Sequence, residues 1–275
     1  MQHRLTRGRL LSVVSLLTLA QVPAQAAEVV AGKTAVATAA SLPMDDTDWH
    51  VTLSPYLWMP SLRGNGAVDG HTGRFKAPFH KLVRDLDFVT MGNIAVNKGR
   101  YGMFFDGQYF DLSKHLSFRA PGVSADTSIR ATQLSLGGFY EVYRRDLGGS
   151  TVFGAPRERT LAPTMGVHWT RMQARAWGEG MSLEQTHTWA VPFVGVRGSY
   201  DLSERWNLSS QWDVGAWGRQ YNLQGQTYLG YRLGILGKES MLRVGAHILH
   251  QDYQDGGFHW NVSQYGPVAG LSMKF

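Results

Sequence analysis

The segment that most constrains the fold is 258–275, FHWNVSQYGPVAGLSMKF, at the C-terminal end of the sequence. Alternate residues from Tyr265 to Phe275 are apolar, and the residues between them are small or polar. Successive side chains of a β-strand point to opposite faces of a sheet, so this pattern predicts a strand with one apolar face. A final strand that is apolar on one face and ends on an aromatic residue is typical of a closed barrel whose outer wall meets lipid.

The composition agrees with a membrane barrel. Charged residues make up only 17% of the chain, aromatic residues make up 12%, and there are 32 glycines and no cysteine. After the N-terminal region, no apolar run approaches the about 20 residues that a transmembrane helix needs. The net charge of +6, to which residues 1–26 contribute three positive charges, is too small to indicate a nucleic-acid partner.

Three regions follow along the chain. Residues 1–26 have a basic start, a short apolar run and the small residues Ala24 and Ala26 at a cleavage position, as in a secretory signal peptide. Residues 27–48 show no clear period and predict a periplasmic N-terminal tail. Residues 49–275 form the expected transmembrane β-barrel.

Ten segments with alternating character predict the barrel strands. They are 49–59, 88–97, 100–112, 124–144, 161–176, 189–202, 206–219, 223–236, 240–253 and 258–275. The expected fold is therefore all-β, an antiparallel up-and-down transmembrane barrel of about ten strands, with eight or twelve as alternatives. Short turns at 98–99, 203–205 and 237–239 indicate the periplasmic side, with both termini on that side.

Two connections remain ambiguous. Residues 60–87 contain a hairpin signal at Asp69 and Gly70 and a short stretch with helical spacing. They predict either an outer hairpin with a helix or two further barrel strands, which would give twelve. Residues 145–160 are a basic periplasmic connection, much longer than the other turns on that side.

Tyrosine and tryptophan residues gather near the predicted strand ends, as expected for side chains at the level of lipid headgroups. Those predicted on the periplasmic side are Trp49, Tyr101, Tyr143, Tyr200, Trp206 and Phe275. Those predicted on the outer side are Trp58, Tyr109, Trp177, Trp189, Trp217 and Trp260.

Several stretches resemble a broad family of Gram-negative outer-membrane β-barrel proteins, small porin-type barrels of the OmpA and OmpW kind. They are DWHVTLSPYLWMP, RDLDFVTMGN, NKGRYGMFFDGQYFDLS, YDLSERW and DGGFHWNVSQYGPVAGLSMKF. The resemblance implies a barrel in the bacterial outer membrane and brings no activity with it. Gly270, Met273 and Phe275 also resemble the C-terminal signal read by the barrel-assembly machinery, which would be a partner during biogenesis. Mature partners would be outer-membrane lipid and lipopolysaccharide.

The inward face of the predicted barrel carries polar and charged residues. The lumen-lining candidates are Asp106, Gln108, Glu141, His168, Arg197, Asp213, Arg232, Arg243 and His247. An open lumen would make them a polar channel whose charges select solutes. A closed lumen would require them to pair with one another, as buried charges must. The barrel width expected for about ten strands allows either arrangement.

We expect a non-enzymatic barrel, either a narrow passive channel or a structural surface protein, with no cofactor, no metal and no catalytic residue. The alternative is a lipid-acting outer-membrane enzyme, since His115 and Ser117 are similar to the His-x-Ser of lipid A deacylases. That pair would need an acidic partner from elsewhere.

Other polar residues allow two interpretations each. His168 and His247 fit paired lumen residues better than metal ligands, because no metal-site spacing is present. Four arginines near outer strand ends could contact lipopolysaccharide phosphates, or could belong to a solvated surface. They are Arg119, Arg130, Arg171 and Arg175.

Overall fold

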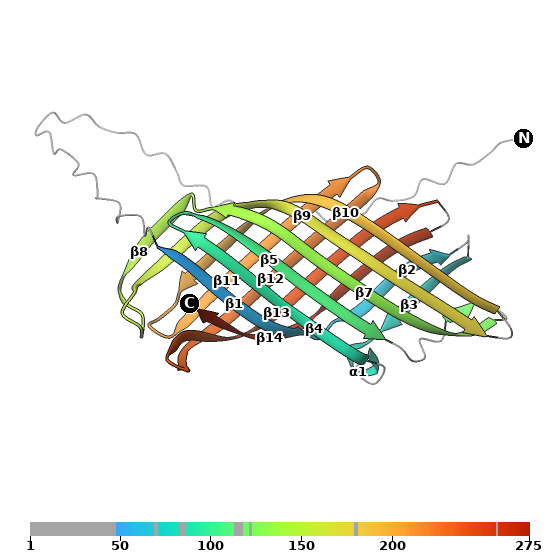
Figure 1. The fold of residues 1–275 in the computed structure, drawn as a ribbon, viewed down its shortest axis with the longest axis horizontal. Helices are drawn as coiled ribbons and strands as arrows, with labels where there is room; N and C mark the ends of the chain where they lie inside the picture. The colour runs from blue at the N-terminus through green and yellow to red at the C-terminus, as the bar shows by residue number, and fades with distance from the viewer. Residues whose placement is uncertain are drawn as a thin grey trace, which may run out of the picture. The chain divides into compact units, whose positions relative to one another are not determined.

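In a computed structural model, the chain forms a closed antiparallel barrel of ten strands (Figure 1). The structure describes residues 48–68, 71–82, 86–112, 118–120, 123–178, 181–256 and 258–275. In order around the wall, the barrel strands are β1 (Trp49–Trp58), β4 (Leu86–Lys98), β5 (Tyr101–Leu112), β7 (Val123–Tyr140), β9 (Pro156–Gly178), β10 (Met181–Asp201), β11 (Trp206–Trp217), β12 (Gln220–Ile235), β13 (Lys238–Asp255) and β14 (Phe258–Lys274). The predicted fold class and strand number are confirmed. The expected signal peptide and almost all of the expected tail lie outside the described residues.

The barrel closes where the last strand meets the first. β14 pairs with β1 in a register that runs from Thr52 opposite Lys274 to Trp58 opposite Val268. Beyond that register, the Val51 N–H donates to the Phe275 carbonyl at 3.2 Å, and the Phe275 N–H donates to the Val51 carbonyl at 2.8 Å. Closure leaves no unpaired strand edge at this seam, which a hydrocarbon environment requires.

The ambiguous segment 60–87 forms a hairpin and a helix, so the twelve-strand alternative is wrong. β2 (Ser61–Val68) and β3 (His71–Ala77) pair with each other, and β2 continues the line of β1 along β14. The short helix α1 (Phe79–Leu82) follows. We call this the hairpin end of the barrel, and the opposite end, which holds Trp49 and Phe275, the terminal end. Among the described residues, no helix is long and apolar enough to cross a membrane.

Residues 145–160, predicted as a long connection, are mostly strand. β8 (Tyr143–Ser150) follows β7 after a break at Glu141 and pairs with the first part of β9, and the two are joined by a turn at 151–155. Its side chains do not alternate between buried and exposed, because most of them are solvent-exposed. The alternating pattern that identifies a strand is therefore absent from this part of the sequence. A further short strand, β6 (Phe118–Ala120), pairs with β7 at the hairpin end.

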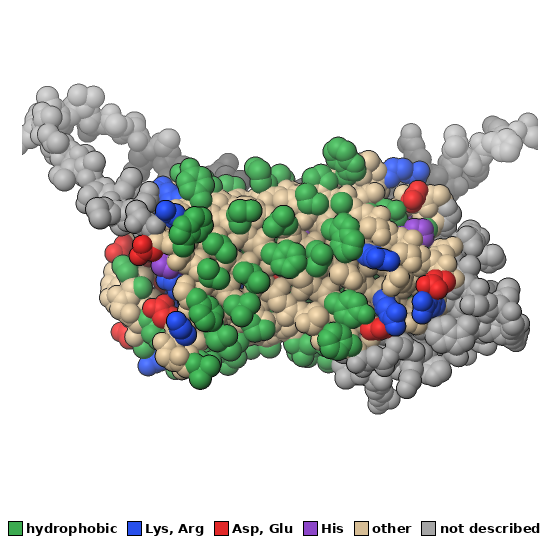
Figure 2. Space-filling view, viewed as in Figure 1, with side chains coloured by type: hydrophobic (Ala, Val, Ile, Leu, Met, Phe, Trp, Pro, Cys, Tyr) green, Lys and Arg blue, Asp and Glu red, His purple; other side chains and the backbone are tan. Residues whose placement is uncertain are grey.

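The outer wall of the barrel is apolar. Figure 2 shows hydrophobic side chains spread over its middle and charged side chains gathered at its two ends. The periplasmic aromatic residues predicted from the sequence are exposed on this wall, and so is Trp217. The same prediction is wrong for Trp58, Trp189 and Trp260, which are buried inside the barrel because they share strand parity with inward-facing residues.

Deletion of Phe275 should destabilise the barrel more than Phe275→Ala does. Both changes remove the exposed ring, but only deletion also removes the two backbone hydrogen bonds with Val51. Because each such bond contributes about 1 kcal/mol net, we expect deletion to lower the free energy of unfolding by about 2 kcal/mol more. Urea unfolding in detergent measures this difference, and equal losses in the two variants would contradict the role of the seam.

Candidate functional site

The candidate site is the interior of the barrel, where side chains from all ten wall strands meet. Alternate residues of each strand point inward, and every wall strand contributes at least one buried side chain. Two apolar clusters lie at different depths. The middle layer consists of Tyr56, Trp58, Met91, Tyr228, Leu249 and Val268. The upper layer, nearer the hairpin end, consists of Ile129, Met172, Trp189, Val191, Tyr253, Phe258, Trp260 and Val262.

His247 packs against the middle layer. Its ring stacks on the Trp58 indole with a centroid distance of 4.1 Å. His247 is 0% exposed and Trp58 is 2% exposed. A side chain that lined a water-filled lumen would be exposed, so the predicted lumen residue His247 instead helps to fill the barrel.

Asp106 is held by neutral hydrogen-bond donors. The Tyr56 hydroxyl donates to its carboxylate at 2.8 Å, and the Asn93 and Gln108 amides donate at 3.4 and 3.5 Å. The Arg243 guanidinium lies over the neighbouring Tyr228 ring, 4.7 Å from its centroid. Asp106 and Gln108 are buried in the barrel, and the structure brings the predicted lumen residues Asp106, Gln108 and Arg243 into one region.

A second interior carboxylate belongs to Asp213. The Thr164 hydroxyl donates to it at 3.0 Å and the Gln211 amide donates at 2.9 Å. A Cβ atom at Gly195 would lie 2.1 Å from the Asp213 carboxylate, so only glycine allows this approach. On the same strand, the Arg197 guanidinium lies 4.3 Å from the centroid of the Phe139 ring.

His168 packs in a similar way to His247. Its Nδ1 atom lies 2.7 Å from the Ser135 hydroxyl, and its ring stacks on Phe193 at 4.1 Å. Both histidines are therefore fixed by aromatic neighbours. Within the described part of the chain, no group of three or more His, Cys, Asp or Glu side chains is placed to hold a metal ion.

Glu141 and Arg232 lie at the terminal end, away from the middle layer. Glu141 pairs with Arg144 at 2.7 Å, and Arg232 pairs with Asp201. Asp201 also accepts hydrogen bonds from the Asn207 amide at 2.7 Å and the Glu158 backbone N–H at 3.1 Å. Sequence reasoning missed Asp201, although it shares inward parity with Arg197 on β10.

The β8–β9 hairpin is joined to this terminal network. The Arg157 guanidinium donates to the backbone carbonyls of Asp201 and Leu202 at 3.2 and 3.1 Å, and the Val152 N–H donates to the Glu204 carbonyl at 3.1 Å. Burial raises the pKa of the nearby Glu158 carboxyl, and the Arg144 guanidinium lowers it by a smaller amount. Charges at this end of the barrel are thus fixed by one another.

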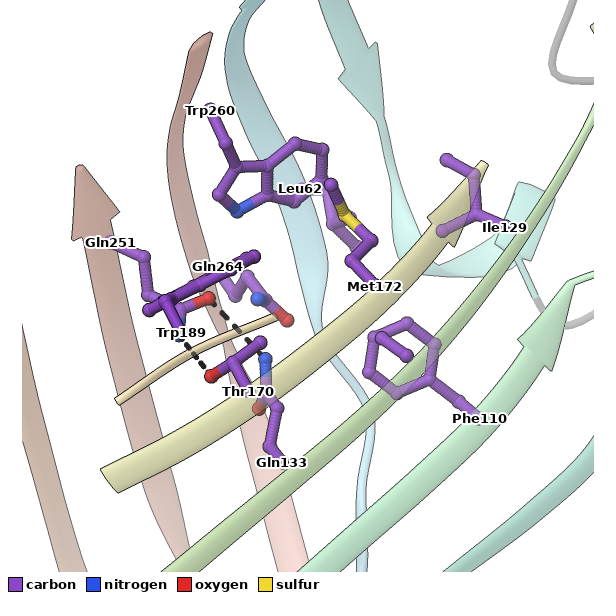
Figure 3. A pocket seen from close by; sticks show the side chains of 11 residues that line it. Leu62, Phe110, Ile129, Gln133, Thr170, Met172, Trp189, Gln251, Trp260 and Gln264 are labelled. Carbon is purple, nitrogen blue, oxygen red and sulfur yellow. Dashed lines mark hydrogen bonds between the residues drawn. The ribbon is translucent and has the colours of Figure 1, made fainter. Parts of the chain in front are cut away.

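A small cavity of about 10 Å³ lies beside the upper layer, whose residues Ile129, Met172, Trp189 and Trp260 line it (Figure 3). On its wall, the Gln133 amide donates to Gln251 at 3.4 Å and the Gln251 amide donates to Thr170 at 3.1 Å. A volume of about 10–15 Å³ holds about one water molecule. At this depth the interior therefore offers room for an ordered water and none for a solute.

The residues of the predicted assembly signal lie on the closing strand. A Cβ atom at Gly270 would lie 2.7 Å from the Tyr56 Cβ atom, so glycine is needed where β14 passes β1. Met273 lies opposite Leu53 in β1 and Ser240 in β13. Phe275 is exposed on the outer wall. These positions agree with a role in closure, and recognition by the assembly machinery stays a prediction.

His115 and Ser117 lie outside the described residues. A different contact between histidine and serine occurs on the outer face near the hairpin end, where the His250 Nδ1 atom lies 3.0 Å from the Ser263 hydroxyl. The nearby Asp252 carboxylate bonds instead to His259 at 3.3 Å and to the Asn261 amide at 2.7 Å. The acidic group that would orient a catalytic histidine is thus engaged elsewhere.

Two of the four arginines considered for lipopolysaccharide contact are in ion pairs. Arg130 pairs with Asp111 at 2.6 Å, and Arg175 pairs with Glu184 at 3.0 Å. Arg171 is exposed on the outer face. Arg119 belongs to β6, but its side chain is outside the described part of the structure. Ion pairing reduces the charge that this surface offers to a phosphate.

Tyr56→Phe tests the interior network. The substitution removes the hydroxyl that donates to Asp106 and leaves a buried carboxylate with one donor fewer. We expect the free energy of unfolding to fall by about 1–3 kcal/mol. Tyr265→Phe, on the exposed outer wall, is the matched control and should change little. Urea unfolding of both variants measures the difference, and similar values for the two would contradict the network.

The fold is similar to that of solved outer-membrane barrels. The outer-membrane protease OmpT from Escherichia coli aligns with a TM-score of 0.51 and 13% identity, over 83% of this chain and 97% of that one. Ail of Yersinia pestis aligns with a TM-score of 0.35 and 8% identity, over 82% of this chain and 98% of that one. The N-terminal barrel of Pseudomonas aeruginosa OprF aligns with a TM-score of 0.30 and 7% identity, over 84% of this chain and 98% of that one. No protein-family model matches the sequence, and no curated protein matches it. The likeness to OmpT shows that the chain has the fold of an outer-membrane β-barrel.

Proposed function

We propose that the protein resides in the bacterial outer membrane as a closed, non-enzymatic barrel with a structural role at the cell surface. The signal peptide predicted at 1–26 would direct its export. The apolar outer wall and the hydrogen-bonded seam support insertion into lipid. Tight turns at Gly99 and Gly237 mark the terminal end, which we assign to the periplasmic side. The hairpin end then faces the exterior.

The observation that carries this proposal is the filled interior. The middle and upper layers contain buried rings from several strands, including the stack of Trp58 on His247. The charges predicted to select solutes, Asp106 and Asp213, bond to neighbouring hydroxyl and amide groups. Of the two non-enzymatic functions expected from the sequence, a structural barrel thus has more support than a narrow passive channel.

The enzymatic alternative has less support. OmpT is a protease, but at 13% identity the likeness concerns the fold alone. The Asp252 carboxylate near the contact between His250 and Ser263 bonds instead to His259 and Asn261. A lipid-acting enzyme would shift lipid A masses in a manner that depends on Ser117 or Ser263. We expect the wild-type protein to leave lipid A masses unchanged, and the Ser117→Ala and Ser263→Ala variants to give the same masses as the wild type.

Conductance of the purified protein in a planar bilayer tests the closed interior. We expect the wild-type protein to insert without discrete channels, because two layers of side chains block the barrel. A variant that truncates both layers, with Trp58, His247, Trp189 and Trp260 all changed to alanine, should open a measurable pore. It also serves as the positive control for insertion.

The outer wall provides the matched control. Trp206→Ala and Trp212→Ala remove exposed rings of the same kind, and both should leave the protein non-conducting. Each variant must first show the heat-modifiable migration of a folded barrel on an SDS gel. Discrete wild-type channels whose ion selectivity changes in Asp106→Ala or Arg232→Ala would overturn the proposal and establish a channel instead.

A further inference from the structure

A depression of about 480 Å³ lies on the outer wall at the terminal end. Its floor is the backbone of β5 and β7 at Gly102 and Gly138, with the Phe139 ring behind it inside the barrel. Gly138 lies between Met103 on β5 and Met165 on β9 in the sheet register. Because Gly138 has no side chain, the wall is hollow at this point.

The walls of the depression are apolar side chains that stand out from the barrel surface. Tyr101 is 70% exposed and Met165 is 68% exposed, values that are high for large apolar residues of this wall. The Tyr101 and Tyr140 rings contact each other, with centroids 4.7 Å apart, and form the rim nearest the terminal end. The face shown in Figure 2 carries such projecting hydrophobic side chains, separated by backbone and other side chains.

One cation lies on this rim. Lys98 lies between Trp49 and Tyr101 in the register, and its Nζ atom is 5.5 Å from the centroid of the Trp49 ring. An ammonium group beside exposed aromatic rings at the edge of an apolar band is at the level of lipid phosphates. The apolar hollow then extends from this cation toward the middle of the membrane.

We propose that the depression, which we call the Gly138 groove, binds one anionic phospholipid. An acyl chain fills the space over Gly138 between Met103 and Met165, and Lys98 holds the headgroup phosphate. The occupant is a phospholipid because the groove lies at the end assigned above to the periplasmic side, where the inner leaflet is phospholipid. The inference rests on that proposed orientation.

Gly138→Leu provides a specific test. A Cβ atom at Gly138 would meet its nearest neighbour, the Gly102 carbonyl oxygen, at 3.6 Å, so a side chain fits there without strain and fills the groove. Gly92→Leu is the matched control. It adds the same side chain to the wall outside the groove, where the nearest neighbour of a Cβ atom is the Ser54 carbonyl oxygen at 3.9 Å.

Native mass spectrometry with added phosphatidylglycerol or phosphatidylethanolamine of identical acyl chains measures the binding. We expect the wild-type protein to retain one phosphatidylglycerol in preference to phosphatidylethanolamine. Lys98→Gln should weaken phosphatidylglycerol binding about tenfold and abolish the preference, as the loss of one charge-assisted contact implies. Gly138→Leu should weaken binding of both lipids at least about tenfold, and Gly92→Leu should bind like the wild type.

Three outcomes would overturn lipid binding in the Gly138 groove. The first is unchanged phosphatidylglycerol binding in Gly138→Leu, and the second is an equal loss of phosphatidylglycerol binding in Gly92→Leu. The third is a wild-type dimer that Gly138→Leu converts to a monomer, which would make the surface an interface between copies. Heat-modifiable migration and insertion into vesicles are measured on the same samples. A protein that fails those two measurements contradicts the membrane barrel itself, whereas a folded barrel without lipid preference contradicts only the groove.

Discussion

The structure depends on one requirement, that every backbone N–H and C=O group within lipid finds a partner in the protein. β14 meets it at the seam by pairing with β13 on one side and with β1 and β2 on the other. A wall of ten strands has an interior between the filled eight-stranded and the open sixteen-stranded barrels. The inward side chains then decide whether the barrel interior is open or filled, and here large aromatic side chains fill it.

Among the described residues at mid-depth, neutral hydrogen-bond donors hold the interior carboxylates, and no close ion pair does. Asp106 and Asp213 accept hydrogen bonds from hydroxyl and amide groups, while Arg197 and Arg243 lie over aromatic rings. A close ion pair occurs at the terminal end, between Arg232 and Asp201. Each buried charge carries a large desolvation cost, and the hydrogen bonds to the two carboxylates offset part of that cost.

Strand positions could be predicted because lipid on one face and a packed interior on the other enforce strict alternation. Outside the lipid this alternation is not required. The sequence therefore predicts a connection where most of β8 lies, and it leaves two alternatives for residues 60–87. Trp58 was assigned to the outer belt by its distance from a strand end, although its parity with Tyr56 points inward. Whether the lumen is filled depends on how ten strands bring side chains together, which no single segment of sequence encodes.

The continuity of β1 into β2 has a consequence for the timing of folding. Residues of β2 are synthesised near the beginning of the chain, yet the partner that extends the wall beside them is β14, the last strand made. Contacts across such a separation form slowly, because nearly the whole chain must be brought together first. The β2–β3 hairpin therefore gains this partner when the barrel closes, so the pairing of β2 with β14 marks completed assembly.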